Sequence, residues 1–334
     1  MRSTLIDIAR DSGVSTATVD RVLNNRAGVS NRTRTIVMET ATRLGYFGQA
    51  EAAVETIRID FILPEGTHPF IAGLKAQIDR QCAAQDGLDY RIHAVEGFNP
   101  LSLAQKMAEL RPVTQGVALI ALDHPSVREE MRALAEAGVK VVTLASDILH
   151  VTRTGSVGVD NRAAGRLGGY LLGRLLPSSP YKIALFAGSL SYRGHEEREM
   201  GFRHIISEEF PHLEIVQMRE IRDDRQRAYE ETIALLDRHP DLAGIYNIGG
   251  GSSGIGRALE DRGRGRAIVF IGHDLTENSK PLLLSGTMDA VIDQNPRVEA
   301  REAIALLANA IRGTSFESHP PRLQVIFREN IPEH

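Results

Sequence analysis

Residues 4–24 read TLIDIARDSGVSTATVDRVLN, a stretch that predicts two short helices joined by a tight turn. Thr4 followed by Asp7 is typical of a capping box, and an apolar stripe begins behind it. Gly13 can adopt the left-handed conformation that ends a helix, and Ser15 can cap the next one. The inward residues of the two predicted helices are Leu5, Ile8, Ala9, Val19, Val22 and Leu23.

A third helix completes this small all-α domain. Ser30 can cap it and Gly45 can end it, with inward residues Ile36, Val37, Ala41 and Leu44. Ala9, Gly13 and Val19 supply a small residue where two helices cross, a turn glycine and a buried β-branched residue. This spacing indicates a helix-turn-helix, although a three-helix module that binds another protein would share it.

The charge of residues 1–46, here called the head, also favours DNA. The head carries seven arginines against four acidic residues, a net +3, whereas the rest of the chain carries −7. In a helix-turn-helix, the second helix would present Thr16, Ala17 and Arg21 to the bases of a major groove. The residues expected at phosphates are Thr18, Ser30, Asn31, Thr33 and Arg34, and Thr4, Ser15 and Asn24 complete the DNA-binding set.

These motifs resemble the head of the lactose/galactose-repressor (LacI/GalR) family of transcription regulators. The resemblance is carried by TLIDIA (4–9), GVS (13–15), TV (18–19), RVLN (21–24), VS (29–30), TR (33–34) and LGY (44–46). It implies that the second helix reads an operator half-site, and that a homodimer reads both halves of a pseudo-palindromic operator. Asp20 departs from the serine usual in the family and places a negative charge near the DNA.

The predicted linker, residues 47–57, departs further from that family. Its members usually have an Arg-Val-Ala-type hinge helix whose leucine wedges into the minor groove and kinks the operator. Here the segment FGQAEAAVET (47–56) contains two glutamates and no leucine, which leaves Ala53 and Val54 as apolar candidates. We therefore expect weaker bending of the operator or a different hinge contact.

The composition limits the class of protein. The chain has 334 residues, 42% of them apolar and 25% charged, which favours two or three globular units and excludes a fibre. One cysteine, Cys82, cannot form an internal disulfide or a multi-thiolate metal site, which fits a reducing cytosol. No apolar run suits a secretory signal or a membrane helix. We expect a cytoplasmic protein with no membrane partner, no metal and no cofactor.

Residues 58–334, here called the body, alternate apolar β-rich runs with amphipathic segments. This alternation predicts an α/β body with two lobes, each a doubly wound parallel sheet. The predicted strands are 59–63, 90–95, 116–122 and 139–144 in lobe 1, and 182–187, 214–218, 244–248, 267–271 and 290–292 in lobe 2. Helices are predicted near 70–86, 100–110 and 126–137, and the C-terminal segment 325–331 as a strand.

The body resembles the sugar-binding type of the periplasmic-binding-protein-like (type I) fold, which the same repressor family uses. By this resemblance, lobe 1 takes about 58–160 and 296–322, and lobe 2 takes about 161–293 and 323–334. The chain should cross between the lobes near 158–163, 290–296 and 320–325, so that the lobes can close on a ligand.

Candidate ligand contacts follow the strand ends, where the cleft of such a fold lies. They are His68, Phe70, Asp123, Ser146, Asp147, Arg198, Asn247, Asp274 and Gln294. By the resemblance, Arg198 matches the family's ligand arginine, and Asn247, Asp274 and Gln294 match further polar contacts. Carboxylates and amides pair with hydroxyls, arginine donates to oxygens and an aromatic face covers C–H surface, which suits a small sugar or polyol. Asp160 is interpreted as a residue that caps a helix or stabilises the crossing between the lobes, rather than as a ligand contact.

Two enzyme classes compete with this interpretation. Gly249–Gly254 matches G-x-G-x-x-G, with Asp274 twenty residues beyond, as in an NAD-dependent oxidoreductase. Ser252, Asp274 and His319 follow the order of a hydrolase triad. A solute-binding protein without DNA function is the third alternative. The head favours a DNA-binding transcriptional regulator of repressor type and no enzyme, and a dimer is expected because no leucine heptad follows the last strand.

Overall fold

The computed structural model describes residues 3–24, 26–44, 46, 56–66 and 68–332. The chain divides into two compact units, Met1–Thr56, which contains the head, and Ile57–His334, which contains the body. The expected hinge candidates Ala53 and Val54, and the expected helix end Gly45, lie outside the described residues. No helix in the described ranges is long and apolar enough to cross a membrane.

The head consists of helices α1 (Leu5–Ser12), α2 (Thr16–Leu23) and α3 (Asn31–Arg43) in its described part. The capping box is present, since Thr4 accepts the Asp7 N–H and the Asp7 carboxylate accepts the Thr4 N–H. Gly13 has a φ of 70° and ends α1, as predicted. The buried residues are Ile8, Ala9, Val19, Val22, Val37 and Ala41. Ile36 was wrongly placed inside, because it lies about 100° around α3 from Val37 and is 40% exposed.

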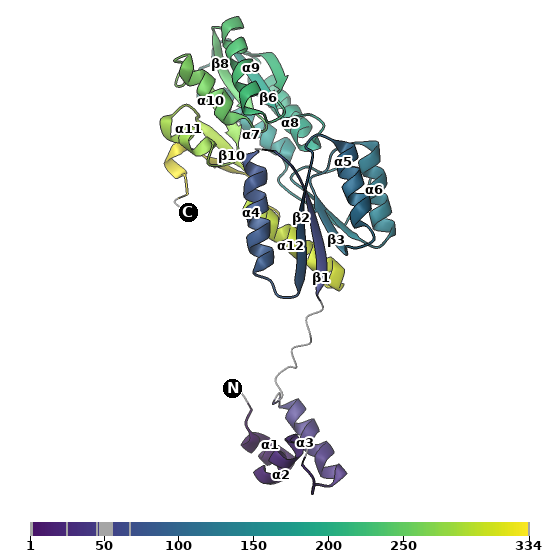
Figure 1. Cartoon of the computed structure of the whole chain (residues 1–334). Coiled ribbons are helices and arrows are strands. Elements are labelled where there is room, and N and C mark those ends of the chain that lie inside the picture. The colour runs from purple at the N-terminus through teal and green to yellow at the C-terminus, as the bar shows by residue number, and fades with distance from the viewer. Residues whose placement is uncertain (1–2, 25, 45, 47–55, 67, 333–334) are drawn as a thin grey trace. The chain divides into compact units, whose positions relative to one another are not determined.

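Lobe 1 is a five-stranded parallel sheet with the order β2-β1-β3-β4-β5 among the described residues. Its strands are β1 (Ile57–Pro64), β2 (Leu88–Val95), β3 (Gly116–Leu119), β4 (Lys140–Leu144) and β5 (Gly155–Val157). Figure 1 shows α4 (Pro69–Ala83) and α12 (Pro296–Arg312) on one side, and α5 (Pro100–Leu110) and α6 (Pro125–Glu136) on the other. The predicted doubly wound architecture is confirmed, while β5 was not predicted.

Lobe 2 repeats this plan with the order β11-β10-β9-β8-β6-β7. Its strands are β6 (Tyr181–Ala187), β7 (Leu213–Glu220), β8 (Leu242–Asn247), β9 (Val269–His273), β10 (Ala290–Asp293) and an antiparallel edge strand β11 (Gln324–Ile326). Residues of β6 alternate between two cores: Ile183 and Leu185 pack with α7 (Asn161–Leu175) and α8 (Arg193–Glu209). Ala184 and Phe186 face α9 (Arg225–Arg238), α10 (Ser252–Asp261) and α11 (Ser279–Ser285).

The chain passes between the lobes three times in the described part of the body. Residues 158–160 lead from β5 to α7, residues 294–295 lead from β10 to α12, and residues 313–323 return the chain to β11. The predicted strand 325–331 is wrong beyond Ile326, because a turn of 3₁₀ helix over Arg328–Asn330 follows it. The Asn330 side chain accepts the Phe327 N–H at 2.6 Å and closes this turn.

Candidate functional site

A cavity of about 280 Å³ lies beyond the carboxyl ends of strands in both lobes, and in lobe 1 it lies where the strand order reverses. In lobe 1 this point is between β1 and β3, and the cavity is lined there by Glu65 and Ile120. In lobe 2 the lining comes from the start of α7, from α8 and from the segments that follow β7, β9 and β10. Ligands of open α/β sheets bind beyond the carboxyl ends of strands at such points. The cavity is thus the candidate ligand site.

A buried guanidinium forms the centre of the cavity wall. Arg198 on α8 is 4% exposed and donates from Nε to Asn161 Oδ1 at 2.8 Å. Its Nη1 donates to the Ile248 carbonyl at 2.9 Å, and its Nη2 to Gln294 Oε1 at 2.6 Å. Gln294 Nε2 in turn donates to both carboxylate oxygens of Asp274, at 2.9 and 3.1 Å. All of these side chains except that of Ile248 line the cavity.

The position of Arg198 depends on glycines where α7 and α8 meet. A Cβ on Gly165 of α7 would lie 1.9 Å from the Arg198 carbonyl oxygen. A Cβ on Gly201 of α8 would lie 2.1 Å from the carbonyl oxygen of Arg162. The two backbones therefore approach each other as closely as only glycine allows. This contact places Arg198 beside Asn161 at the start of α7.

Burial changes the ionisation of the cavity wall. It raises the pKa of Asp274 to about 6, the Asp293 carboxylate adds to this rise, and Arg198 opposes it. Burial lowers the pKa of His195 to about 4, so its imidazole is neutral near pH 7. A carboxylate that ionises near neutrality and a neutral imidazole can both accept hydrogen bonds from hydroxyl groups.

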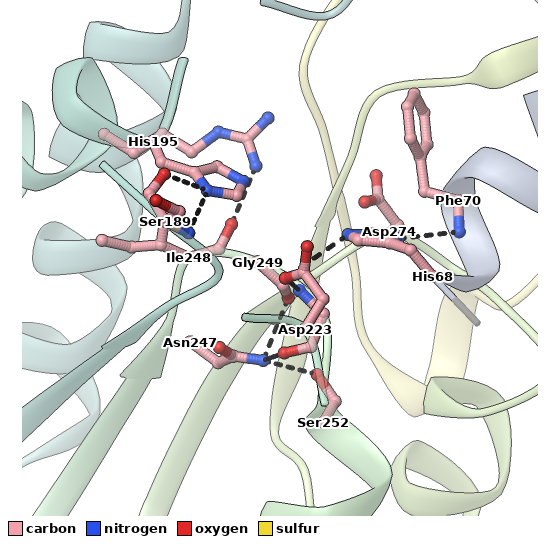
Figure 2. Close-up of polar contacts among 12 residues, drawn as sticks. His68, Phe70, Ser189, His195, Asp223, Asn247, Ile248, Gly249, Ser252 and Asp274 are labelled. Atoms are coloured by element: carbon pink, nitrogen blue, oxygen red, sulfur yellow. Dashed lines mark hydrogen bonds and ion pairs between the residues drawn. The ribbon is translucent and has the colours of Figure 1, made fainter. Parts of the chain in front are cut away.

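Asp223 lies in front of the glycine-rich loop, the segment that begins at Gly249 and leads into α10 (Figure 2). Its Oδ1 accepts the Gly250 N–H at 2.7 Å and lies 3.9 Å from Nε2 of His68 in lobe 1. A Cβ on Gly249 would approach that same carboxylate oxygen within 2.7 Å, so the loop glycines make room for Asp223. A dinucleotide phosphate at this loop would meet a carboxylate, which disfavours the oxidoreductase interpretation.

Strained backbone surrounds the cavity. Among the described residues that line it, Phe98, Ala145, Arg222, Asp223 and Asp274 have φ between 52° and 65°. Such conformations cost of the order of 1–3 kcal/mol each in non-glycine residues and cluster at ligand sites. The Arg222 guanidinium also lies 5.5 Å from the ring centre of Phe98, so a cation–π contact joins lobe 2 to lobe 1.

The structure brings six of the nine predicted ligand contacts to the cavity: His68, Phe70, Ser146, Arg198, Asp274 and Gln294. Asp123 lies outside the lining and pairs with Arg128. Asp147 also lies outside it, paired with Arg153 and with the Thr143 hydroxyl.

Asn247 is fully buried beneath the glycine-rich loop rather than in the cavity lining. Its Nδ2 donates to the carbonyls of Gly249 and Gly250 at 3.0 and 2.8 Å, and to Ser252 Oγ at 2.9 Å (Figure 2). The Ser252 hydroxyl oxygen therefore already accepts a hydrogen bond from the Asn247 amide. The backbone N–H of His319 donates to Glu302 of α12 in lobe 1, so the contacts of these residues do not form a triad.

Sequence reasoning missed several lining residues. Asn161, Tyr192 and His195 lie at or near helix starts, and Phe98 and Asp223 lie in loops after β2 and β7. Arg198 was among the expected ligand contacts, but the residue three positions earlier on the same helix, His195, was not. Spacing of three residues on one helix face was the available signal. Asp160 caps α7 through the Ala163 N–H at 2.9 Å, as interpreted from the sequence.

The head divides its predicted DNA contacts between an open face and structural roles. Thr16, Ala17, Arg21 and Asn31 are exposed. Ser15 and Ser30 cap α2 and α3 by accepting the N–H groups of Thr18 and Thr33, both at 3.2 Å, and Thr4 caps α1. Arg34 donates to the carbonyls of Val22 and Arg26 at 3.4 and 3.0 Å, which holds the α2–α3 connection.

Asp20, the departure from the resembled pattern, forms a local cluster on α2. Its carboxylate accepts from Asn24 Nδ2 at 2.8 Å and pairs with Arg26 at 3.2 Å. The negative charge on α2, the helix predicted to read DNA, is therefore partly compensated within the head.

Two family models cover most of the chain. The periplasmic binding protein domain matches residues 59–315, and the lacI family of bacterial regulatory proteins matches residues 4–49. The chain belongs to the LacI family. This LacI-family protein combines a helix-turn-helix head with a periplasmic-binding-protein-like body, and the predictions of fold and family are both confirmed.

Named relatives agree with this assignment. The LacI-family chain is 26% identical to the HTH-type transcriptional regulator DegA of Bacillus subtilis over 250 residues, 73% of this chain and 72% of DegA. It is 27% identical to the ribose operon repressor of Haemophilus influenzae over 212 residues, 62% of this chain and 61% of that repressor. A solute-binding protein of Burkholderia graminis, solved in complex with D-arabinose, has the same fold as the body. Its TM-score is 0.77 at 21% identity, over 84% of this chain and 98% of that protein.

Proposed function

We propose that this LacI-family regulator binds a pseudo-palindromic operator as a homodimer, and that a small neutral sugar or polyol in the cavity switches its operator affinity. The observation that carries the proposal is the pairing of two features in one chain: an exposed reading face on α2, and a cavity walled by Arg198 and Asp274 between two lobes. A ligand that changes the lobe angle changes operator affinity, and DNA then changes ligand affinity by the same coupling free energy.

The chemistry of the cavity supports a polyhydroxylated ligand. Asp274 and His195 offer acceptors and Arg198 offers donors, while Phe70 and Tyr192 supply apolar ring surface. The solved neighbour with D-arabinose and the relative named for the ribose operon add pentoses to the first compounds to test.

The charge of the lining supports a neutral ligand over an anionic one. Glu65, Asp223, Asp224 and Asp274 outnumber the two guanidinium groups, those of Arg198 and Arg222. Three of the five Arg198 N–H groups already have acceptors, and Arg222 lies over Phe98. A phosphorylated sugar would therefore bring its charge into an acidic environment.

The DNA half of the proposal is tested by fluorescence anisotropy. The purified full chain is titrated against labelled DNA from upstream of its own coding region and against scrambled DNA, across a salt series. We expect selective binding with a steep salt dependence, because phosphate contacts release counterions. Equal affinity for both DNAs, with and without the sugars below, would overturn the operator assignment.

The ligand half is tested by thermal shift and titration calorimetry with D-ribose, D-arabinose, other aldoses, polyols and inositols. D-ribose 5-phosphate provides the anionic comparison. Stabilisation by a neutral compound and none by the phosphate is the expected result. Stabilisation by the phosphate alone would contradict the neutral-ligand assignment. Addition of the stabilising compound to the anisotropy assay then shows whether it releases or retains the operator.

A further inference from the structure

Arg198 is bonded to two of the segments that connect the lobes. Asn161, which accepts from its Nε at 2.8 Å, is the first residue of α7 and directly follows the 158–160 crossing. Gln294, which accepts from its Nη2 at 2.6 Å, begins the 294–295 crossing. One guanidinium therefore fixes the distance between two segments whose torsions must change when the lobes rotate.

The guanidinium itself is held by lobe 2. Its Nη1 donates to the Ile248 carbonyl just after β8, and the close α7–α8 contact at Gly165 fixes the backbone of Arg198. Asn161, Arg198 and Gln294 are 6%, 4% and 3% exposed, so water does not readily replace their hydrogen bonds. Both crossing segments are thus hydrogen-bonded to a side chain whose position is fixed by lobe 2.

The same side chains form the wall of the ligand cavity. Gln294 uses its amide oxygen for Arg198 and its amide nitrogen for Asp274, so Asn161, Arg198, Gln294 and Asp274 form one continuous chain of hydrogen bonds. A ligand that bonds to Arg198 or Asp274 is therefore in direct contact with this chain of hydrogen bonds. The cross-cleft contact between His68 and Asp223 is longer, 3.9 Å, and its partners are more exposed.

We propose that Asn161 and Gln294 are positioning residues that set the angle between the lobes through Arg198, and that they transmit ligand occupancy of the cavity to the hinge. The part that concerns ligand occupancy rests on the proposed function. The part that concerns the lobe angle does not, because it follows from the contacts of the protein without ligand.

The lobe angle is measured as a distance distribution between two spin labels on the full-length chain. The labels are placed at R132C on α6 and L284C on α11, both exposed positions, while the native Cys82 is buried and remains unlabelled. The variants are Gln294→Met, which removes the amide at similar volume, and Asn161→Ala. Gln217→Met is the matched control, because Gln217 is a buried glutamine that accepts from Arg238 Nη1 at 2.9 Å on β7, away from the crossings.

We expect the distribution to be narrow in the parent and in Gln217→Met, and at least twofold broader in Gln294→Met and Asn161→Ala. Circular dichroism melting confirms that each variant is folded before the comparison. An unchanged distribution in folded Gln294→Met and Asn161→Ala would overturn the proposal. Addition of D-ribose or D-arabinose forms a second arm, in which any shift seen in the parent should be lost in Gln294→Met. If neither sugar shifts the parent, nor any other compound of the panel, the proposed ligand fails while the first arm still decides the role of the two residues.

Discussion

Asp274 combines burial with a direct place in the cavity wall, so its ionisation should control ligand binding. Burial raises its pKa to about 6. Hydroxyl groups donate to the ionised carboxylate, so ligand affinity should be full above pH 7 and should fall up to about tenfold per pH unit below 6. Calorimetric titrations of the stabilising sugar at pH 7.5, 6.0 and 5.0 measure this. Asp274→Asn should bind weakly at every pH, and a parent profile that stays flat to pH 5 would contradict the assignment.

Glu299, on α12, provides a test of stability. Burial raises its pKa from 4.5 to about 8, so the native protein retains a proton that the unfolded chain has released. The free energy of unfolding should therefore decrease as pH rises from about 5 to about 8, by up to about 1.4 kcal/mol for each pKa unit of difference. Between pH 7 and 8.5, above the pKa of Asp274, the melting temperature should fall in the parent and remain nearly level in Glu299→Gln.

Glu302 on the same helix is the control for that measurement. Burial pushes its pKa up, but hydrogen bonds from the His319 N–H and from Arg301 outweigh burial and lower it. Glu302 is ionised in both states throughout that pH range. Glu302→Gln should change the melting temperature without removing the parent's pH slope, and loss of the slope in this variant would point away from Glu299.

At the scale of elements, the α7–α8 contact is the feature most sensitive to a single methyl group. Gly165→Ala would place a Cβ 1.9 Å from the Arg198 carbonyl oxygen, so the helices must separate. We expect destabilisation of about 1–3 kcal/mol and loss of sugar binding. Gly73→Ala in α4 is the control, since its Cβ would meet Pro296 Cγ at an ordinary 3.8 Å, and should be neutral or stabilise by up to about 1 kcal/mol. Chemical denaturation and calorimetry distinguish the two.

The sequence predicted elements well where local chemistry determines them. Caps at Thr4, Ser15 and Ser30 and the turn at Gly13 define α1, α2 and α3 through short-range hydrogen bonds. Long apolar runs likewise predicted most strands of both sheets. β5 escaped prediction because its three residues carry no apolar run and pair only at the edge of the sheet. The end of β11 was misjudged because an Asn330 side chain, rather than hydrophobicity, turns the chain.

The candidate site was less predictable, because strand ends show where a cleft lies but not which side chains enter it. Asp123 and Asp147 follow strands as expected, yet nearby Arg128 and Arg153 hold them outside the cavity lining. Asn247 turns under its own loop to satisfy backbone carbonyls. Which partner a polar side chain finds depends on contacts between distant segments, which a local pattern does not contain.

At the scale of the whole molecule, reading DNA and sensing a ligand reside in separate units. Arg21→Ala alters the exposed face of α2 in the head and should reduce the difference in affinity between operator and scrambled DNA, with sugar affinity unchanged. Arg198→Ala removes the centre of the cavity wall and should abolish sugar binding while operator binding persists. Anisotropy and calorimetry on both variants measure these effects. Loss of both activities in either variant, with an intact melting transition, would contradict the division of roles.

The placement of α12 has a consequence for biosynthesis. This helix covers one face of the lobe 1 sheet, yet it is made after all five strands of that sheet and most of lobe 2. At roughly 5–20 residues per second, it emerges on the order of 10–50 seconds after β1. Until then α4 covers that face only at β1 and β2, and the apolar face of β3, β4 and β5 is exposed to aggregation and to chaperones. The head can fold during the first seconds of translation, well before the unit to which it must respond.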